Sequence, residues 1–153
     1  MDYKYITRSY DELYKEEQLE KLKIIKENTK INKGDNLLDV GCGTGLSTEF
    51  FDCNSIGIDP CFEMLKKDSI CGKAENLPFR DKTFDIVLAV TSIHHFDAKK
   101  AIKEIKRVSK KKVIITLLKK AKRFKYVKDL LNKSFKFKEV DGKKDLIFIQ
   151  HGN

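Results

Sequence analysis

Glycines at alternate positions within residues 37–45 (LLDVGCGTG) give the chain its clearest chemical signal. These glycines are Gly41, Gly43 and Gly45. They follow an apolar run of β-strand composition that contains Asp39, and residues 44–51 have the composition of a helix start. Glycine allows the backbone to turn sharply and to approach a ligand closely, and the start of a helix offers free N–H groups. The run predicts a ligand-binding turn, and the alternative is a tight strand-to-helix turn without a ligand.

The spacing of the glycines argues against a dinucleotide fingerprint, because that motif needs a further glycine where this chain has Leu46. Asp59 ends a second short apolar segment, residues 55–59, and lies eighteen residues after Gly41. An acid at the end of the second strand can accept hydrogen bonds from a ribose diol. Asp59 is therefore a candidate ribose ligand, and the alternative is a surface turn before Pro60.

Four segments resemble, in this order, the motifs of Rossmann-like (class I) S-adenosylmethionine-dependent methyltransferases, and most closely those of ubiquinone and menaquinone biosynthesis. The segments are residues 37–45, 55–59, 72–87 and 92–96. The resemblance implies an enzyme that transfers a methyl group from S-adenosylmethionine to an acceptor and leaves S-adenosylhomocysteine. In this family the central sheet has seven strands.

The resemblance also implies which residues bind the cofactor. They are Asp39, Gly41, Cys42, Gly43, Gly45, Asp59, Pro60, Ala74, Glu75, Leu77 and, from the N-terminal segment, Tyr10. A carboxylate beside the turn suits the ammonium group of this ligand. In many relatives the residue before Ala74 is an acid that accepts from the adenine amino group, but here it is Lys73, which has no acceptor. We therefore expect the adenine at the backbone of Ala74, with Glu75 as a substitute acceptor.

His94 and His95 are the candidate catalytic residues, because they follow the predicted strand 84–90 near the expected methyl group. The sulfonium is already activated, so displacement needs mainly alignment of the acceptor with the methyl group. A base is required only when the accepting atom must lose a proton, and a neutral imidazole suits that role. The alternative is structural: one histidine packs beneath the cofactor and the other caps the helix at Asp97.

Alternating strand and helix patterns predict one methyltransferase domain over residues 1–153, with an N-terminal helical lid at 1–33 and a Rossmann-like core at 34–153. The expected strands are residues 36–40, 55–59, 69–73, 84–90, 112–118, 135–140 and 146–150, and the expected helices are residues 9–28, 44–51, 61–68, 97–108 and 121–132. This order predicts an α/β fold with a doubly wound, mostly parallel sheet, a C-terminal antiparallel hairpin and helices on both faces. Ligands bind at the carboxyl ends of such strands, where Asp39, Asp59, Ala74 and His94 all fall.

Composition favours an intracellular enzyme. The cysteines form no Cys-x-x-Cys pair, which disfavours a zinc site or a disulfide framework, so we expect no metal. No apolar run approaches the roughly 20 residues of a membrane helix, and the charged N-terminus lacks a signal-peptide pattern. These features predict a cytoplasmic monomer or homodimer without membrane contact.

Basic residues concentrate in the C-terminal part of the chain. Residues 1–98 carry 13 basic and 18 acidic side chains, whereas residues 99–144 carry 19 and 4. A basic face attracts polyanions, and the alternative is an ordinary solvated face. Three hypotheses follow. The sequence favours a methyltransferase acting on a small-molecule acceptor beneath the lid. The others are a methyltransferase that docks RNA or protein on residues 99–144, and a cofactor-binding subunit without catalysis.

Overall fold

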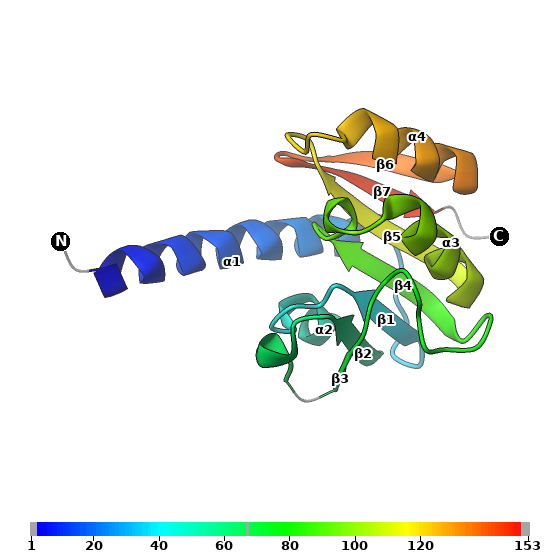
Figure 1. Cartoon of the computed structure of the whole chain (residues 1–153), viewed down its shortest axis with the longest axis horizontal. Coiled ribbons are helices and arrows are strands. Elements are labelled where there is room, and N and C mark those ends of the chain that lie inside the picture. Colours follow the sequence, from blue (N-terminus) through cyan, green and yellow to red (C-terminus); the bar gives the residue numbers. More distant parts are fainter. Residues whose placement is uncertain (1–2, 67, 151–153) are drawn as a thin grey trace.

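A seven-stranded sheet forms the centre of the chain, as the computed structural model in Figure 1 shows. The structure describes residues 3–66 and 68–150, with side chains from residue 12 onward. The strands are β1 (Asn36–Val40), β2 (Asn54–Asp59), β3 (Ser69–Cys71), β4 (Phe84–Val90), β5 (Ser109–Leu118), β6 (Phe137–Gly142) and β7 (Asp145–Gln150). Their order across the sheet is β3-β2-β1-β4-β5-β7-β6.

The first five strands are parallel, and among the last two only β7 runs in the opposite direction. β1 pairs with β2 and β4, β2 pairs with β3, and β4 pairs with β5. β7 runs antiparallel to both β5 and β6. The chain winds outward from β1 in both directions, so a crevice forms where the winding changes, at the carboxyl ends of β1 and β4. The predicted fold class is confirmed, including the terminal hairpin.

Helices cover both faces of the sheet (Figure 1). The helices are α1 (Tyr3–Asn28) and α2 (Leu46–Phe50) on one face, and α3 (Ala98–Val108) and α4 (Phe124–Ser134) on the other. Successive strand side chains point to opposite faces. Leu38 and Val87 therefore pack in the core cluster of α3 and α4, whereas Leu37 and Leu88 pack in that of α1. Burial on both faces explains why the central strands are almost continuously apolar.

The predicted helix over residues 61–68 is wrong, because only a 3-10 turn, η1 (Phe62–Met64), forms there. Phe62 and Met64 are exposed, so a longer helix would bury no apolar face in return for ordering its backbone. Asp68 adopts a left-handed backbone (φ 62°), which interrupts any helix just before β3. The carboxyl end of β2 is thus bordered by an irregular segment.

Among the residues of α1 whose side chains are described, 12–28, those of the second half pack on the sheet. Leu22 and Ile25 are fully buried, whereas Leu13 and Tyr14 are 54% and 51% exposed, and the first turns of α1 extend beyond the sheet (Figure 1). A lid function for residues 1–33 stays a prediction, since the Tyr10 side chain lies outside the described residues. No helix in the described part of the chain is both long and apolar enough to span a membrane.

Candidate functional site

The glycine loop, residues 41–45, borders a pocket of about 540 Å³ at the carboxyl end of β1. The pocket is lined by Tyr14, Lys15, Gln18, Leu22, Gly41, Cys42, Gly43, Thr44, Leu46, Ser47, Glu49, Met64, Lys66 and Val90. Its walls therefore come from α1, the loop, α2, the segment around η1 and the end of β4. This glycine-loop pocket lies where the strand order predicts a crevice.

The three glycines have left-handed backbones, with φ of 75°, 52° and 90° at Gly41, Gly43 and Gly45. Residues with a Cβ rarely adopt this region. Gly41 also packs tightly, because a Cβ there would lie 2.6 Å from Cβ of Ser92. A Cβ at Gly43 would meet only Cε of Met64, at 3.3 Å, and a Cβ at Gly45 would meet nothing within 4 Å. Gly41 thus closes the loop against the protein, Gly43 faces the end of the Met64 side chain, and Gly45 faces open space.

The Asp39 carboxylate is fully buried beside the loop. Its Oδ2 accepts hydrogen bonds from Ser47 Oγ at 2.5 Å and from Thr48 Oγ1 at 2.8 Å. Its Oδ1 has no partner among the described residues. Burial raises the pKa of Asp39 to about 6, although the two hydroxyl donors act in the opposite direction. Asp39 therefore keeps one buried acceptor available to a polar ligand.

Asp59, at the end of β2, ties the glycine loop to the neighbouring strand. Its Oδ2 accepts from the Gly43 N–H at 3.0 Å, and its Oδ1 accepts from the Cys61 N–H at 2.9 Å. Each carboxylate oxygen can accept more than one hydrogen bond, so both remain able to accept from a diol. Holding the backbone of Gly43 is a second role, which the sequence did not predict.

Gly57 of β2 is a site residue that the motifs did not single out. A Cβ at this position would lie 2.5 Å from Sγ of Cys42, so only glycine leaves room for the cysteine. Burial raises the pKa of the Cys42 thiol to about 12, which keeps it neutral and unreactive. Cys42 therefore anchors the loop by packing. The available signal was a glycine inside a strand pattern, which often marks a close approach.

The predicted adenine residues lie in residues 72–83, which cross from β3 to β4 without a helix. Ala74 and Leu77 are buried in the core cluster of α3, and Glu75 is half-buried. Leu77 thus contributes to the core, whereas Pro60 and Lys73 are exposed.

Helix α3 holds this crossing segment by hydrogen bonds. Glu104 Oε1 accepts from the Leu77 N–H at 3.0 Å, and Arg107 donates to the carbonyls of Leu77 and Phe79 at 3.0 and 2.7 Å. The hydrogen bond from Arg107 is the main cause that lowers the pKa of Glu104. The expected adenine side of the site is therefore fixed by side chains of a helix that follows it in sequence.

His94 and His95 lie in the 3-10 turn η2 (Ile93–His95), directly after β4. Their ring centroids are 4.0 Å apart. His95 is exposed, whereas His94 is half-buried and its Nδ1 has no partner among the described residues. Burial is the main cause that lowers the pKa of His94, so the imidazole is neutral at neutral pH.

The histidine turn lies against the glycine loop. Ser92 Oγ donates to the carbonyl of Val40, the last residue of β1, at 3.0 Å. The structure therefore brings His94, Asp39, Asp59 and the glycines to one edge of the sheet, as the sequence predicted. Asp97 itself caps α3, so the capping alternative for a histidine is not supported.

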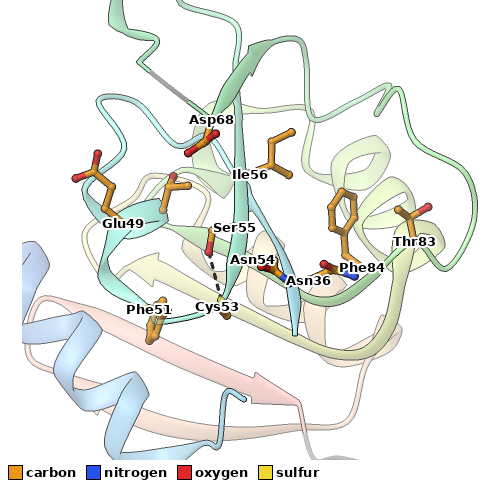
Figure 2. Close-up of a pocket in the computed structure, with 11 residues that line it drawn as sticks. Asn36, Glu49, Phe51, Cys53, Asn54, Ser55, Ile56, Asp68, Thr83 and Phe84 are labelled. Atoms are coloured by element: carbon orange, nitrogen blue, oxygen red, sulfur yellow. Dashed lines mark hydrogen bonds between the residues drawn. The ribbon is translucent and has the colours of Figure 1, made fainter. Parts of the chain in front are cut away.

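A second pocket, of about 680 Å³, lies away from these residues (Figure 2). It opens beside the amino-terminal ends of β1, β2 and β4, which Asn36, Asn54 and Phe84 mark. None of the predicted site residues lines it. In the residues that the structure describes, no group of three or more His, Cys, Asp or Glu side chains could hold a metal ion.

Comparisons with known proteins give the family of the sequence. A family model described as a methyltransferase domain matches residues 38–117. An uncharacterized protein of Methanocaldococcus jannaschii is 34% identical over 116 residues, which cover 71% of this chain and 46% of that protein. A probable tRNA methyltransferase 9B of Homo sapiens is 36% identical over 90 residues, which cover 49% of this chain and 19% of that protein. The chain thus spans less than half the length of these relatives.

Comparison with solved structures gives the fold. A crystal structure from Thermotoga maritima, described as a SAM-dependent methyltransferase and possible histamine N-methyltransferase, matches with a TM-score of 0.76. The match is 20% identical and covers 97% of both chains. The Rossmann-like architecture of the whole described chain is therefore shared with a solved protein.

Proposed function

The chain belongs to the methyltransferase domain family, whose members use S-adenosylmethionine. We propose that it transfers the methyl group of this cofactor to an acceptor bound where the glycine loop and the histidine turn meet. One observation carries the proposal. The glycine loop, with its three left-handed glycines, borders a pocket and lies beside two carboxylates: Asp59 accepts from the Gly43 N–H, and Asp39 has one oxygen without a partner among the described residues.

The residues around the loop fit the cofactor. The unpartnered Oδ1 of Asp39 would accept from its ammonium group, since a buried acceptor gains from a partner. Asp59 would accept from its ribose diol, and the backbone of Ala74 with the side chain of Glu75 would hold its adenine. Tyr10 is proposed to cover the pocket from α1.

Bound S-adenosylmethionine supplies a methyl group that its sulfonium already activates. The chain then needs to orient the acceptor and to limit access of water. His94 is neutral and has a free buried Nδ1, so it is suited to take a proton from an acceptor atom that must lose one. For an acceptor that needs no base, the His94 side chain would only help to shape the site at which the acceptor binds.

Calorimetric titration with S-adenosylmethionine tests cofactor binding. We expect wild type to bind and Gly43→Val to remain folded without binding, because the branched side chain would take up room in the pocket that the loop borders. Gly34→Val is the matched control, since its backbone is not left-handed and a Cβ there meets nothing within 4 Å. Absence of binding by wild type would overturn the proposal.

A basic loop at the same edge of the sheet supports RNA as the acceptor. The basic loop comprises Lys119, Lys120, Lys122 and Arg123, which follow β5 directly. Because β5 is parallel to β4, the loop leaves the sheet at the edge where the histidine turn lies. All four side chains are exposed, and the Arg123 guanidinium lies 4.4 Å from the ring centroid of exposed Tyr126. Basic and aromatic side chains together suit contacts to phosphates and bases.

We therefore place RNA ahead of the small-molecule acceptor that the sequence favours. Lys15 and Lys66 add positive charge at the glycine-loop pocket. The human relative named as a probable tRNA methyltransferase adds support from outside this chain. No comparable observation favours a protein acceptor.

A labelled-methyl assay tests the acceptor class. Wild type and a variant with all four basic-loop residues changed to glutamine are incubated with labelled cofactor and the RNA, protein and small-molecule fractions of a cell extract. We expect label in RNA, and less of it with the variant. The RNA affinity of the variant should also depend less on salt, since each lost phosphate contact lowers the slope of log K against log salt by nearly one unit for duplex nucleic acid. Label confined to small molecules would instead establish the small-molecule acceptor.

A further inference from the structure

Four polar side chains from four elements meet in the core beside the histidine turn. They are Lys21 of α1, Thr91 after β4, Thr116 of β5 and Asp145 of β7. Lys21 Nζ donates to Asp145 Oδ1 at 3.1 Å and to Thr91 Oγ1 at 2.6 Å. Thr91 Oγ1 donates to Asp145 Oδ2 at 2.9 Å, and the Thr91 N–H donates to Thr116 Oγ1 at 2.8 Å. We call these four residues the buried network.

Lys21, Thr116 and Asp145 are buried although two of them are charged, and Thr91 is half-buried. The Lys21 side chain is 7% exposed and that of Asp145 is 0% exposed. A buried ion pair is seldom more stable than well-packed apolar side chains of the same volume, because both charges lose their hydration. An exposed pair, Lys143 with Glu20, already joins the same helix to the same hairpin at 3.0 Å. Attachment of α1 to the sheet therefore does not by itself account for the buried pair.

Thr91 is the residue on which the network converges. Its backbone is left-handed, with φ of 49°, a conformation that β-branched residues rarely adopt. Such a conformation persists only where the surroundings hold it. Here the Thr91 N–H is bonded to Thr116, and its hydroxyl is bonded to both Lys21 and Asp145. The network thus fixes the direction in which the chain leaves β4.

The residues after Thr91 carry this direction to the histidines. Ser92 is bonded to the carbonyl of Val40 and packs against Gly41, and Ile93 is fully buried. His94 follows immediately, with its ring against that of His95. No residue between Thr91 and His94 is free to absorb a change in the direction of the chain.

We infer that the buried network is a positioning system that holds the His94–His95 ring pair beside the glycine loop, at the edge of the sheet where the proposed reaction takes place. Lys21, Asp145 and Thr116 act through Thr91 and are positioning residues for the proposed reaction, on which this inference rests. The same lysine ties α1 to the sheet between Gln18 and Leu22, two residues that line the pocket. One network thus orients the pocket wall and the histidine turn together.

The two charges of the network also act on His94. Asp145 raises the pKa of His94, whereas Lys21 and neighbouring His95 lower it, and burial lowers it most. The first test of positioning therefore keeps both charges. Thr91→Val and Thr91→Ser form the matched pair: valine preserves the branched shape without the hydroxyl, and serine preserves the hydroxyl.

The experiment is histidine NMR on the whole chain, combined with calorimetric titration of S-adenosylmethionine. The sequence contains three histidines, so the imidazole signals can be assigned with His94→Gln and His95→Gln variants. We expect Thr91→Val to lose the cross-peak between the two rings and to broaden or split the His94 signals. Thr91→Ser should restore the wild-type spectrum, and Lys143→Met, which removes only the exposed pair, should leave it unaltered.

A double variant, Lys21→Met with Asp145→Leu, covers the case in which Thr91→Val fails to fold. It replaces the ion pair with apolar side chains and leaves neither charge buried alone. We expect a folded protein that has lost the cross-peak between His94 and His95. A wild-type ring pair in this double variant, or in folded Thr91→Val, would overturn the inference. Failure of wild type to bind the cofactor would instead refute the proposed function, because the histidine spectra need no ligand.

Discussion

Replacing Asp39 with asparagine should remove a pH dependence from the stability of the fold. Burial raises the pKa of this carboxyl group from 3.8 to about 6, so the folded state binds its proton more tightly than the unfolded state does. Its contribution to stability is then fully present below pH 3.8 and is lost as the pH rises through about 6. One pKa unit corresponds to about 1.4 kcal/mol, so the loss amounts to about 3 kcal/mol.

Urea unfolding of wild type and Asp39→Asn, from about pH 4 to about pH 8, measures this loss, because that range spans the raised pKa. Asparagine can still accept from Ser47 and Thr48 but cannot ionise. We expect the stability of Asp39→Asn relative to wild type to rise by about 3 kcal/mol from the acidic to the neutral end.

Asp85→Asn is the control with the opposite sign. The hydrogen bond from the Asn36 N–H lowers the pKa of Asp85, so wild type should lose stability relative to this variant as the pH falls. A difference between Asp39→Asn and wild type that does not vary with pH would refute the claim that Asp39 is buried in an unfavourable ionised form.

Further predictions concern the cofactor and the loop. Asp59→Ala should weaken binding of S-adenosylmethionine by about 1.5–3 kcal/mol, the scale of a hydrogen bond to a charged group, and an unchanged calorimetric affinity would remove the ribose assignment. Gly41→Ala should lower the melting temperature, unlike Gly34→Ala, because its Cβ would lie 2.6 Å from Cβ of Ser92; equal melting temperatures would contradict this packing. His94→Gln should slow methyl transfer only for acceptors that lose a proton, with cofactor affinity kept, and an equal rate for such an acceptor would exclude the base role.

The sequence alone was sufficient for the fold class and for the place in the fold of several candidate site residues. Glycines at 41, 43 and 45 are visible in the sequence because a left-handed turn next to a strand restricts the residue type locally. Asp39, Asp59 and His94 were predicted to share one edge because each lies at or just after the carboxyl end of a predicted parallel strand, and parallel strands end together. These inferences needed only short segments and the topology that their order implies.

Local sequence patterns did not predict structure that depends on packing between segments distant in the sequence. Residues 61–68 have helical composition, yet no surface is available to bury Phe62 or Met64, and only a single turn forms. The contact of Gly57 with Cys42 and the hold of Arg107 on residues 72–83 likewise join segments that no sequence pattern links.

The buried network shows most clearly what only the tertiary structure decided. Lys21 and Asp145 are 124 residues apart, and each by itself is an ordinary charged residue in a lysine-rich chain. They meet because α1 packs across the sheet where β7 begins beside β5. Lys21 shares the inner face of α1 with buried Gln18, Leu22 and Ile25, because these positions have helical spacing. The partner that allows its charge to be buried, Asp145, comes from the last strand. A charge can enter the core only where the fold brings its counter-charge, and that meeting is a property of the whole chain.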